Sequence, residues 1–350
     1  MNHNNNLNAV RLIAAALVVI GHSFNLLGLA APTWFYMACH SVAVTAFFVI
    51  SGYLVAKSWS NDPSLPRFVV RRLVRIAPGL VGVVALSALV IGPVFTVLPI
   101  GAYFASPGFG SYFWNLALAP AYTLPGVFAD GRPSVGVNGT LWSLPVEIAM
   151  YAGLLVYGRQ QSQMCRMVLL PLALVGALAV AFWFQVMRPA QIEPVIWWNS
   201  VPFGLRFAGS FVIGAAVCVW RLERFLSVQV AVLLLMGTGL FLPYPSVTMA
   251  LAMLVLPYAV LSFGLARSPV LGWAGGRADV SYGVYLWGAP VQQMLISVFG
   301  PAMHPLLLIA TALPITLVVA YGSWRLIERP ALQFKPRRER VLAAQPLLAR

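Results

Sequence analysis

Long apolar runs follow one another along most of this 350-residue chain, and they restrict its possible folds more than any other feature. A helix needs about 20 apolar residues to cross a bilayer. Only helices and closed barrels can satisfy their backbone polar groups in lipid, so runs of this length predict an all-α, polytopic membrane bundle of about ten transmembrane helices. The ten runs cover residues 7–30, 37–57, 77–99, 140–158, 168–187, 200–220, 228–243, 247–266, 281–299 and 305–326.

The charged residues support a single membrane domain. They make up only 9% of the chain, against roughly 25% in soluble domains. The sequence shows no internal repeat and no separate soluble domain. We expect residues 1–334 to form one integral membrane domain and residues 335–350 to form a basic cytoplasmic tail. The first run could instead be a signal peptide, but Arg11 and His22 within it favour a retained helix.

The net charge of +14 lies mainly in alternate loops, which sets the expected orientation. Basic residues in short loops mark the cytoplasmic side of a membrane protein. Both termini should therefore be cytoplasmic, and the bilayer, rather than a nucleic acid, is the expected partner of the positive charge. The expected cytoplasmic residues are Lys57, Arg67, Arg71, Arg72, Arg75, Arg159, Arg166, Arg221, Arg224, Arg267, Arg277, Arg329, Lys335, Arg337, Arg338 and Arg340, against only Arg132 and Arg188 outside.

Arg11 and His22 are costly residues inside the first apolar run. Eleven residues separate them, so both point from one helix face, about 16 Å apart along the axis. We expect Arg11 near the cytoplasmic end and His22 near mid-membrane. Imidazole suits proton transfer near neutral pH. Taken singly, each has a plain alternative, a histidine hydrogen-bonded between helices and an arginine reaching the headgroups. The shared face favours a functional site.

Glu147 carries one of the chain's eight acidic side chains and lies within an apolar run. With Thr140, Ser143 and Tyr151 it forms a polar stripe at helical spacing, which must face the bundle interior or water. Glu147 could orient His22 or act as an acid or base itself. The alternative is a structural ion pair between helices, for instance with Arg206.

A basic helical segment is expected from Pro66 to near Pro78. Arg67, Arg71 and Arg75 recur every four residues on it, with Arg72 alongside. Such a face can clamp phosphates or anchor lipid headgroups, and spacing alone favours the anchor.

Other polar residues carry weaker signals. Ser281 and Tyr285 share a helix face and serve packing at least as often as chemistry. Asp279 is a candidate helix N-cap. We expect His40 and His304 to be interfacial. The cysteines and histidines have no metal-ligand spacing, so no metal is expected.

The segment from Gly101 to Gly139 is the longest expected outer loop. It is rich in Gly, Pro and aromatic residues, and loops of this length are often functional. Residues 111–122 could form a short interfacial or re-entrant helix.

Taken together, these segments resemble acyltransferase family 3, a family of membrane proteins that includes bacterial O-acetyltransferases of surface polysaccharides and nodulation factors. The matching pieces occur in the family's order and span nearly the whole chain. They are Arg11 with His22, Phe47–Tyr53 (FFVISGY), Arg71–Pro78 (RRLVRIAP), Leu141–Glu147 (LWSLPVE), Ser281–Trp287 (SYGVYLW) and Ile327–Pro330 (IERP).

The resemblance implies an O-acyltransferase of the bacterial cytoplasmic membrane. Acetyl-CoA or another acyl-CoA would place its phosphates on Arg71, Arg72 and Arg75, and no metal would be needed. His22 would act as general base on an acceptor hydroxyl or would accept the acyl group transiently, and Glu147 would support it. The acceptor, a surface glycan or glycolipid, would approach from outside. The expected cavity or acceptor-side residues are Ser143, Tyr151, Arg206, Ser281 and Tyr285.

Two residues depart from the family pattern. Gly288 stands where many members carry a histidine, and Thr45 stands where an acidic residue is common. The fused hydrolase-like domain of some members is also absent from this sequence. None of these differences touches Arg11, His22 or Glu147, so simple O-acylation remains the expectation.

Two other classes of function fit a polytopic membrane chain. Intramembrane Arg, His and Glu also build proton relays, so a proton-coupled transporter or flippase of a glycan or lipid-linked intermediate is the main alternative. The absence of a repeat in the sequence disfavours it. A structural membrane subunit is disfavoured by the clustered ionisable groups. The sequence does not determine the oligomeric state.

Overall fold

The computed structural model describes residues 5–129, 136–160, 163–183, 195–196, 199–267 and 279–336. The fold is helical, which confirms the predicted class. The only strands in the described ranges form two short hairpins, β1 (Thr33–Trp34) with β2 (Met37–Ala38) and β3 (Val195–Ile196) with β4 (Asn199–Ser200). The predicted basic tail lies almost wholly outside the described residues.

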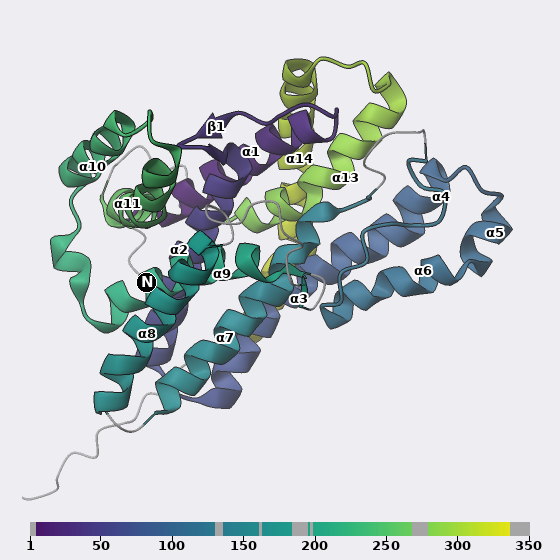
Figure 1. The fold of residues 1–350 in the computed structure, drawn as a ribbon. Coiled ribbons are helices and arrows are strands. Elements are labelled where there is room, and N and C mark those ends of the chain that lie inside the picture. The colour runs from purple at the N-terminus through teal and green to yellow at the C-terminus, as the bar shows by residue number, and fades with distance from the viewer. Residues whose placement is uncertain are drawn as a thin grey trace, which may run out of the picture.

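The helices pack as one bundle, in which α10 and α11 lie on the side opposite the short helices α4 to α6 (Figure 1). The helices are α1 (Leu7–Asn25), α2 (Cys39–Asn61), α3 (Leu65–Leu86), α4 (Gly92–Phe95), α5 (Ile100–Ala105), α6 (Pro107–Tyr112), α7 (Ser143–Arg159), α8 (Gln163–Phe182), α9 (Val201–Val219), α10 (Val228–Leu240), α11 (Pro245–Leu265), α13 (Ser281–Phe299), α14 (Pro305–Ser323) and α15 (Arg329–Ala331).

A helix lies on each of the ten predicted apolar runs. Among the described residues, six helical stretches are long and apolar enough to cross a membrane by length and composition. The chain is therefore a multi-pass membrane protein, whereas the count of ten spans and the orientation of the termini stay predictions. The six stretches are Leu7–Asn25, Cys39–Asn61, Leu65–Phe95, Gly139–Arg159, Pro245–Leu265 and Pro305–Phe334.

The helix boundary expected near Pro78 is wrong. Helix α3 runs through Pro78 and continues by a π-helical turn, Ser87–Ile91, into α4. A proline removes one backbone hydrogen bond, but neighbouring helices can satisfy the freed groups. Pro78 frees the carbonyl of Val74, four residues earlier, while the Tyr282 hydroxyl of α13 donates to the Ile76 carbonyl at 2.9 Å and ties this part of α3 to α13. The basic face is thus the first half of a long membrane helix and not a separate surface helix.

The first helix is shorter than its apolar run. Helix α1 ends at Asn25, and the chain turns at Gly28, whose φ of 75° is left-handed. His22 consequently lies in the last turn of α1, not at its middle. Arg11 and His22 mark opposite ends of the same helix.

Part of the long outer loop is helical. The candidate helix over residues 111–122 is helical only in its first part, which comprises the end of α6 and the 3₁₀ turn Phe113–Ala117. The buried Asn115 side chain ends this stretch by donating to the carbonyls of Tyr112 and Ala121, each at 2.7 Å. Side-chain hydrogen bonds of this kind to backbone carbonyls compete with the hydrogen bonds of a continuing helix.

Glycines allow α2 and α9 to approach closely. A Cβ on Gly52 would overlap the Phe211 carbonyl, and one on Gly214 would overlap the Val49 carbonyl. Small residues at such crossings let helix backbones touch in membrane proteins. This contact fixes α2, which carries one wall of the site described below.

Replacing Gly52 with alanine should destabilise the bundle by about 1–3 kcal/mol, because the new methyl group has no space and a helix backbone must move. The measurement is the thermal unfolding temperature in detergent. Gly237→Ala in α10 is the matched control, since nothing lies within 4 Å of its Cβ position. Equal melting temperatures for Gly52→Ala and wild type would show that α2 and α9 are not tightly apposed.

Candidate active site

A cavity of about 120 Å³ lies among α1, α2, α3, α7 and α13. Its wall combines apolar side chains with three arginines, one carboxylate and several hydroxyl groups. Interior cavities of this mixed character are the usual place for a small-molecule site. The lining residues are Arg11, Val44, Phe47, Phe48, Ile50, Ser51, Leu54, Val55, Arg72, Arg75, Ile76, Ser143, Leu144, Glu147, Tyr151, Tyr282 and Tyr285.

Most of the predicted site residues meet at this cavity. Seven of them line it, whereas His22, Arg71, Arg206 and Ser281 are not among its lining residues. The seven are Arg11, Arg72, Arg75, Ser143, Glu147, Tyr151 and Tyr285.

Glu147 is held on the cavity wall by two hydroxyl groups. Ser51 of α2 donates to Oε1 at 2.9 Å, and the Tyr151 hydroxyl donates to the same oxygen. None of the ion pairs among the described residues includes Glu147, so the suggested pair with Arg206 is not formed there. Glu147 is bound to α2 and to its own helix, not to His22.

The predicted polar stripe of α7 also contacts α13. The hydroxyls of Ser143 and Tyr285 lie 2.6 Å apart, and Tyr285 donates to the Thr140 carbonyl at 3.0 Å. These bonds place both side chains in the interior and fix the wall opposite α2.

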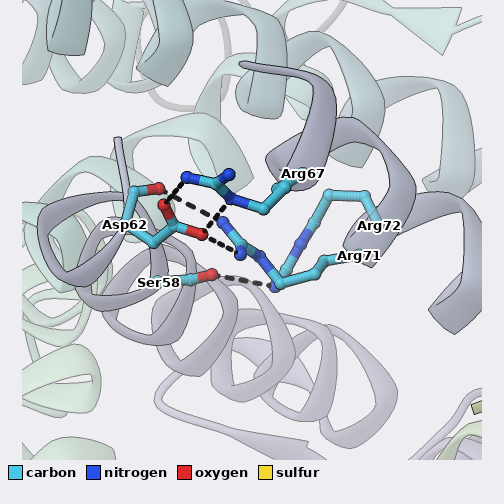
Figure 2. Close-up of polar contacts among 5 residues, drawn as sticks. All are labelled: Ser58, Asp62, Arg67, Arg71 and Arg72. Atoms are coloured by element: carbon cyan, nitrogen blue, oxygen red, sulfur yellow. Dashed lines mark hydrogen bonds and ion pairs between the residues drawn. The ribbon is translucent and has the colours of Figure 1, made fainter. Parts of the chain in front are cut away.

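The basic face of α3 is partly neutralised by Asp62, which lies just after α2 (Figure 2). Arg67 donates to both carboxylate oxygens, at 2.8 and 3.0 Å, and Arg71 donates to Oδ2 at 2.6 Å. The hydrogen bonds from Arg67 and then Arg71 hold the pKa of Asp62 well below its ordinary value. Arg71 is 8% exposed and is occupied by this pair, so its contact with a ligand phosphate stays a prediction that the geometry does not favour.

A second carboxylate, Asp279, joins three helices. Its Oδ2 accepts from Arg11 of α1 at 2.6 Å and from Arg75 of α3 at 2.7 Å, just before α13 begins. Burial raises the pKa of the Asp279 carboxyl, but the charges of Arg11 and Arg75 more than offset this and lower it. The expectation that Asp279 caps α13 is wrong: Val280 is the N-cap residue, and Asp279 instead accepts from the Ser281 hydroxyl at 2.6 Å.

Arg72 is the cavity arginine that is left without a carboxylate. In the described part of the chain it makes no ion pair; it donates to Ser58 at 3.4 Å and lies over the rings of Phe68 and Tyr151. Desolvation, followed by the charges of Arg72 and its neighbouring arginines, lowers the pKa of Lys335. The cavity wall carries three arginines and one carboxylate, and this excess of positive charge favours an anionic ligand.

His22 lies at the other end of the bundle. Its ring stacks on His40, in the first turn of α2, with ring centroids 5.1 Å apart and an interplanar angle of 23°. The α2 wall connects the two places, because Val44, Phe47 and Ser51 line the cavity and His40 lies one turn before Val44 on the same face. The histidine pair thus continues the stripe that lines the cavity.

Four residues make contacts that the sequence does not predict. Ser51 stands in the sequence only as part of the segment Phe47–Tyr53, and Asp62 and Asp279 give no local sign of their arginine partners. His40 was expected to be interfacial, yet it contacts His22. The signal that could have found it was its spacing of four, seven and eleven residues from Val44, Phe47 and Ser51.

The described residues contain no group of three or more His, Cys, Asp and Glu side chains that could hold a metal ion.

Comparisons with known proteins agree with this chemistry. A family model described as an acyltransferase domain matches residues 4–325. An O-acetyl transferase of Shigella phage Sf6 is 26% identical over 348 residues, covering 94% of this chain and 96% of the relative. Nodulation protein 10 of Rhizobium leguminosarum bv. viciae is 29% identical over 360 residues, covering 95% and 94%. No solved structure matches the chain significantly.

Proposed function

Because the chain belongs to the acyltransferase-domain family whose model matches residues 4–325, we propose that it transfers an acyl group, most simply acetyl, from cytoplasmic acyl-CoA to a hydroxyl of a surface glycan or glycolipid. The O-acetyl transferase relative supports the acetyl group and the oxygen acceptor. The membrane would be the bacterial cytoplasmic membrane, with both termini in the cytoplasm, as the loop charges indicate.

The arginine-lined cavity is the observation that carries the proposal. Arg11, Arg72 and Arg75 lie at the end of the bundle that the loop charges assign to the cytoplasm. Phosphate groups bind such sites through charge-assisted hydrogen bonds. Arg72 has no carboxylate partner among the described residues, so it is the first candidate for a CoA phosphate, with Arg75 beside it.

The apolar stripe of α2 gives the donor a route inward. Val44 and Phe47 line the cavity between the arginines and the histidine pair. The pantetheine arm of the donor would lie along this wall and bring its thioester toward His22. Arg11 and His22 are about 16 Å apart along α1, so an extended arm is required.

Transfer then needs a base at the acceptor hydroxyl. His22 takes the hydroxyl proton as the oxygen attacks the thioester carbonyl, the C–S bond breaks, and CoA leaves as the thiol after receiving the proton. Transient acylation of His22 is the other course. Glu147 lies on the cavity wall and not beside His22, so its proposed role is that of an acid, base or anchor along the donor channel.

Replacing Arg72 with alanine should weaken acetyl-CoA binding about tenfold or more, because it removes a cation that can donate to a phosphate. The measurement is the Kd for CoA on purified protein in nanodiscs. Arg159→Ala, an exposed arginine in the last turn of α7, is the control and should bind CoA as wild type does. Equal CoA affinity for wild type and Arg72→Ala would contradict phosphate binding by Arg72 and would favour a lipid-anchoring role for the basic face of α3.

A transporter or flippase needs no acyl donor. It would move a glycan or lipid-linked intermediate across the bilayer without consuming acyl-CoA. Movement of such a substrate in the absence of acyl-CoA would favour that function over acyl transfer.

A further inference from the structure

The end of the bundle opposite the arginine-lined cavity holds a second polar cluster. It consists of His22 in the last turn of α1, His40 in the first turn of α2 and Arg206 in α9. The two imidazoles are stacked. Arg206 contacts Met37, three residues before His40, which places its guanidinium at this end of α2. Three helices thus bring three basic side chains together.

This cluster contains no acid in the described part of the chain. Arg206 is 7% exposed. In the described structure its guanidinium donates to the sulfur of Met37, a weak acceptor, and lies over the ring of Phe207. The His40 Nδ1 is buried and has no hydrogen-bond partner among the described atoms.

Three arginines at the other end of the bundle differ. The buried Arg71 pairs with Asp62, and the partly buried Arg11 and Arg75 pair with Asp279. A buried charge is normally paired, because an unpaired one loses its hydration without compensation. The cluster is thus a group of basic side chains, and the described residues supply no anionic partner for it.

A tight hairpin covers the cluster. Met37, which contacts Arg206, belongs to β2, and the two residues joining β1 to β2 are Phe35 and Tyr36. Both have left-handed φ angles, 50° and 61°, which bulky side chains rarely adopt. The Tyr36 hydroxyl donates to the Leu242 carbonyl after α10, which ties the hairpin to α10. Backbone strain of this kind is found at ligand-binding sites.

We propose that Arg206 and His40 bind an oxyanion group of the acyl acceptor, a phosphate or a carboxylate close to the hydroxyl that is acylated. This inference rests on the proposed function, in which the acceptor hydroxyl comes to His22. A guanidinium binds either oxyanion through paired hydrogen bonds. Neutral glycans without such a group would be poor acceptors.

The test measures oxyanion binding without turnover. Purified full-length chain in nanodiscs of neutral lipid is first saturated with CoA, which occupies the arginine-lined cavity. Inorganic pyrophosphate and methyl glucuronoside are then titrated separately by calorimetry. Wild type should bind one of the two probes, and which one binds tells phosphate-bearing from carboxylate-bearing acceptors.

The variants tie this binding to the cluster. Arg206→Gln should weaken it about tenfold or more, and Arg206→Lys, which keeps the charge but loses the fork, should weaken it less. Arg159→Gln, at the exposed end of α7, should bind as wild type does. Should Arg206→Gln fold poorly, Arg206→Lys and His40→Gln carry the comparison, with melting temperatures recorded for each.

Unchanged binding in the Arg206 variants, or no binding of either probe to the CoA-loaded chain, would overturn this proposal. The CoA titration on the same samples is read separately. Failure to bind CoA, with oxyanion binding intact and dependent on Arg206, would count against the donor and not against this site.

Discussion

Replacing His22 with alanine should lower acyl transfer by about 10²–10⁴-fold, the usual contribution of a positioned general base. The folded yield should stay close to wild type, because most bundle packing comes from apolar and small residues elsewhere. The measurement is transfer from acetyl-CoA, divided by the amount of folded protein extracted in detergent. His304→Ala, at an exposed histidine before α14, is the control and should keep its activity.

Wild-type turnover in His22→Ala would remove His22 from the mechanism. The stacked partner would then need testing, since His40 is the nearest other imidazole. A loss of transfer together with loss of folded protein would indicate a structural role for His22 instead.

Replacing Asp279 with alanine should destabilise the folded chain by about 3 kcal/mol, because two guanidiniums lose their shared carboxylate. The side chains of Arg11, Asp279 and Arg75 are 17%, 23% and 24% exposed, so the effect belongs at the lower end of the range for buried pairs. Thermal unfolding in detergent measures it.

The control for Asp279→Ala is Glu223→Ala. Glu223 lies in the 3₁₀ turn after α9 and makes no ion pair within the described ranges. The Glu223→Ala substitution should change the free energy of unfolding by no more than about 0.5 kcal/mol. Equal stabilities for the two variants would mean that Asp279 does not hold α1, α3 and α13 together.

The fold class could be predicted from the sequence, and so could the inward position of several candidate site residues, whose roles stay predictions. Apolar runs predict membrane helices because lipid leaves a chain few alternatives. The same cost predicts that Arg11 and Glu147 face the interior, and both line the cavity. Helical spacing likewise places Ser143 and Tyr151 on the Glu147 face.

The pairings between distant residues could not be predicted. Asp279 meets Arg11 across a sequence separation of 268 residues, and no local pattern encodes that meeting. His22 lies in the last turn of α1 because the apolar run continues past the helix, which ends at Asn25 before the left-handed Gly28. The end of α3 could not be predicted from Pro78, because the helix-breaking effect of a proline depends on the groups that surround it.

The central claim is that this membrane protein consumes acyl-CoA to acylate a glycan hydroxyl. The most direct measurement is release of free CoA by purified protein in proteoliposomes that contain acetyl-CoA on the basic-loop side and the host's surface glycan on the other. Wild type should release one CoA for each O-acetyl group formed, and His22→Ala should release almost none. Glycan movement across the bilayer without CoA release would contradict the claim and identify a transporter.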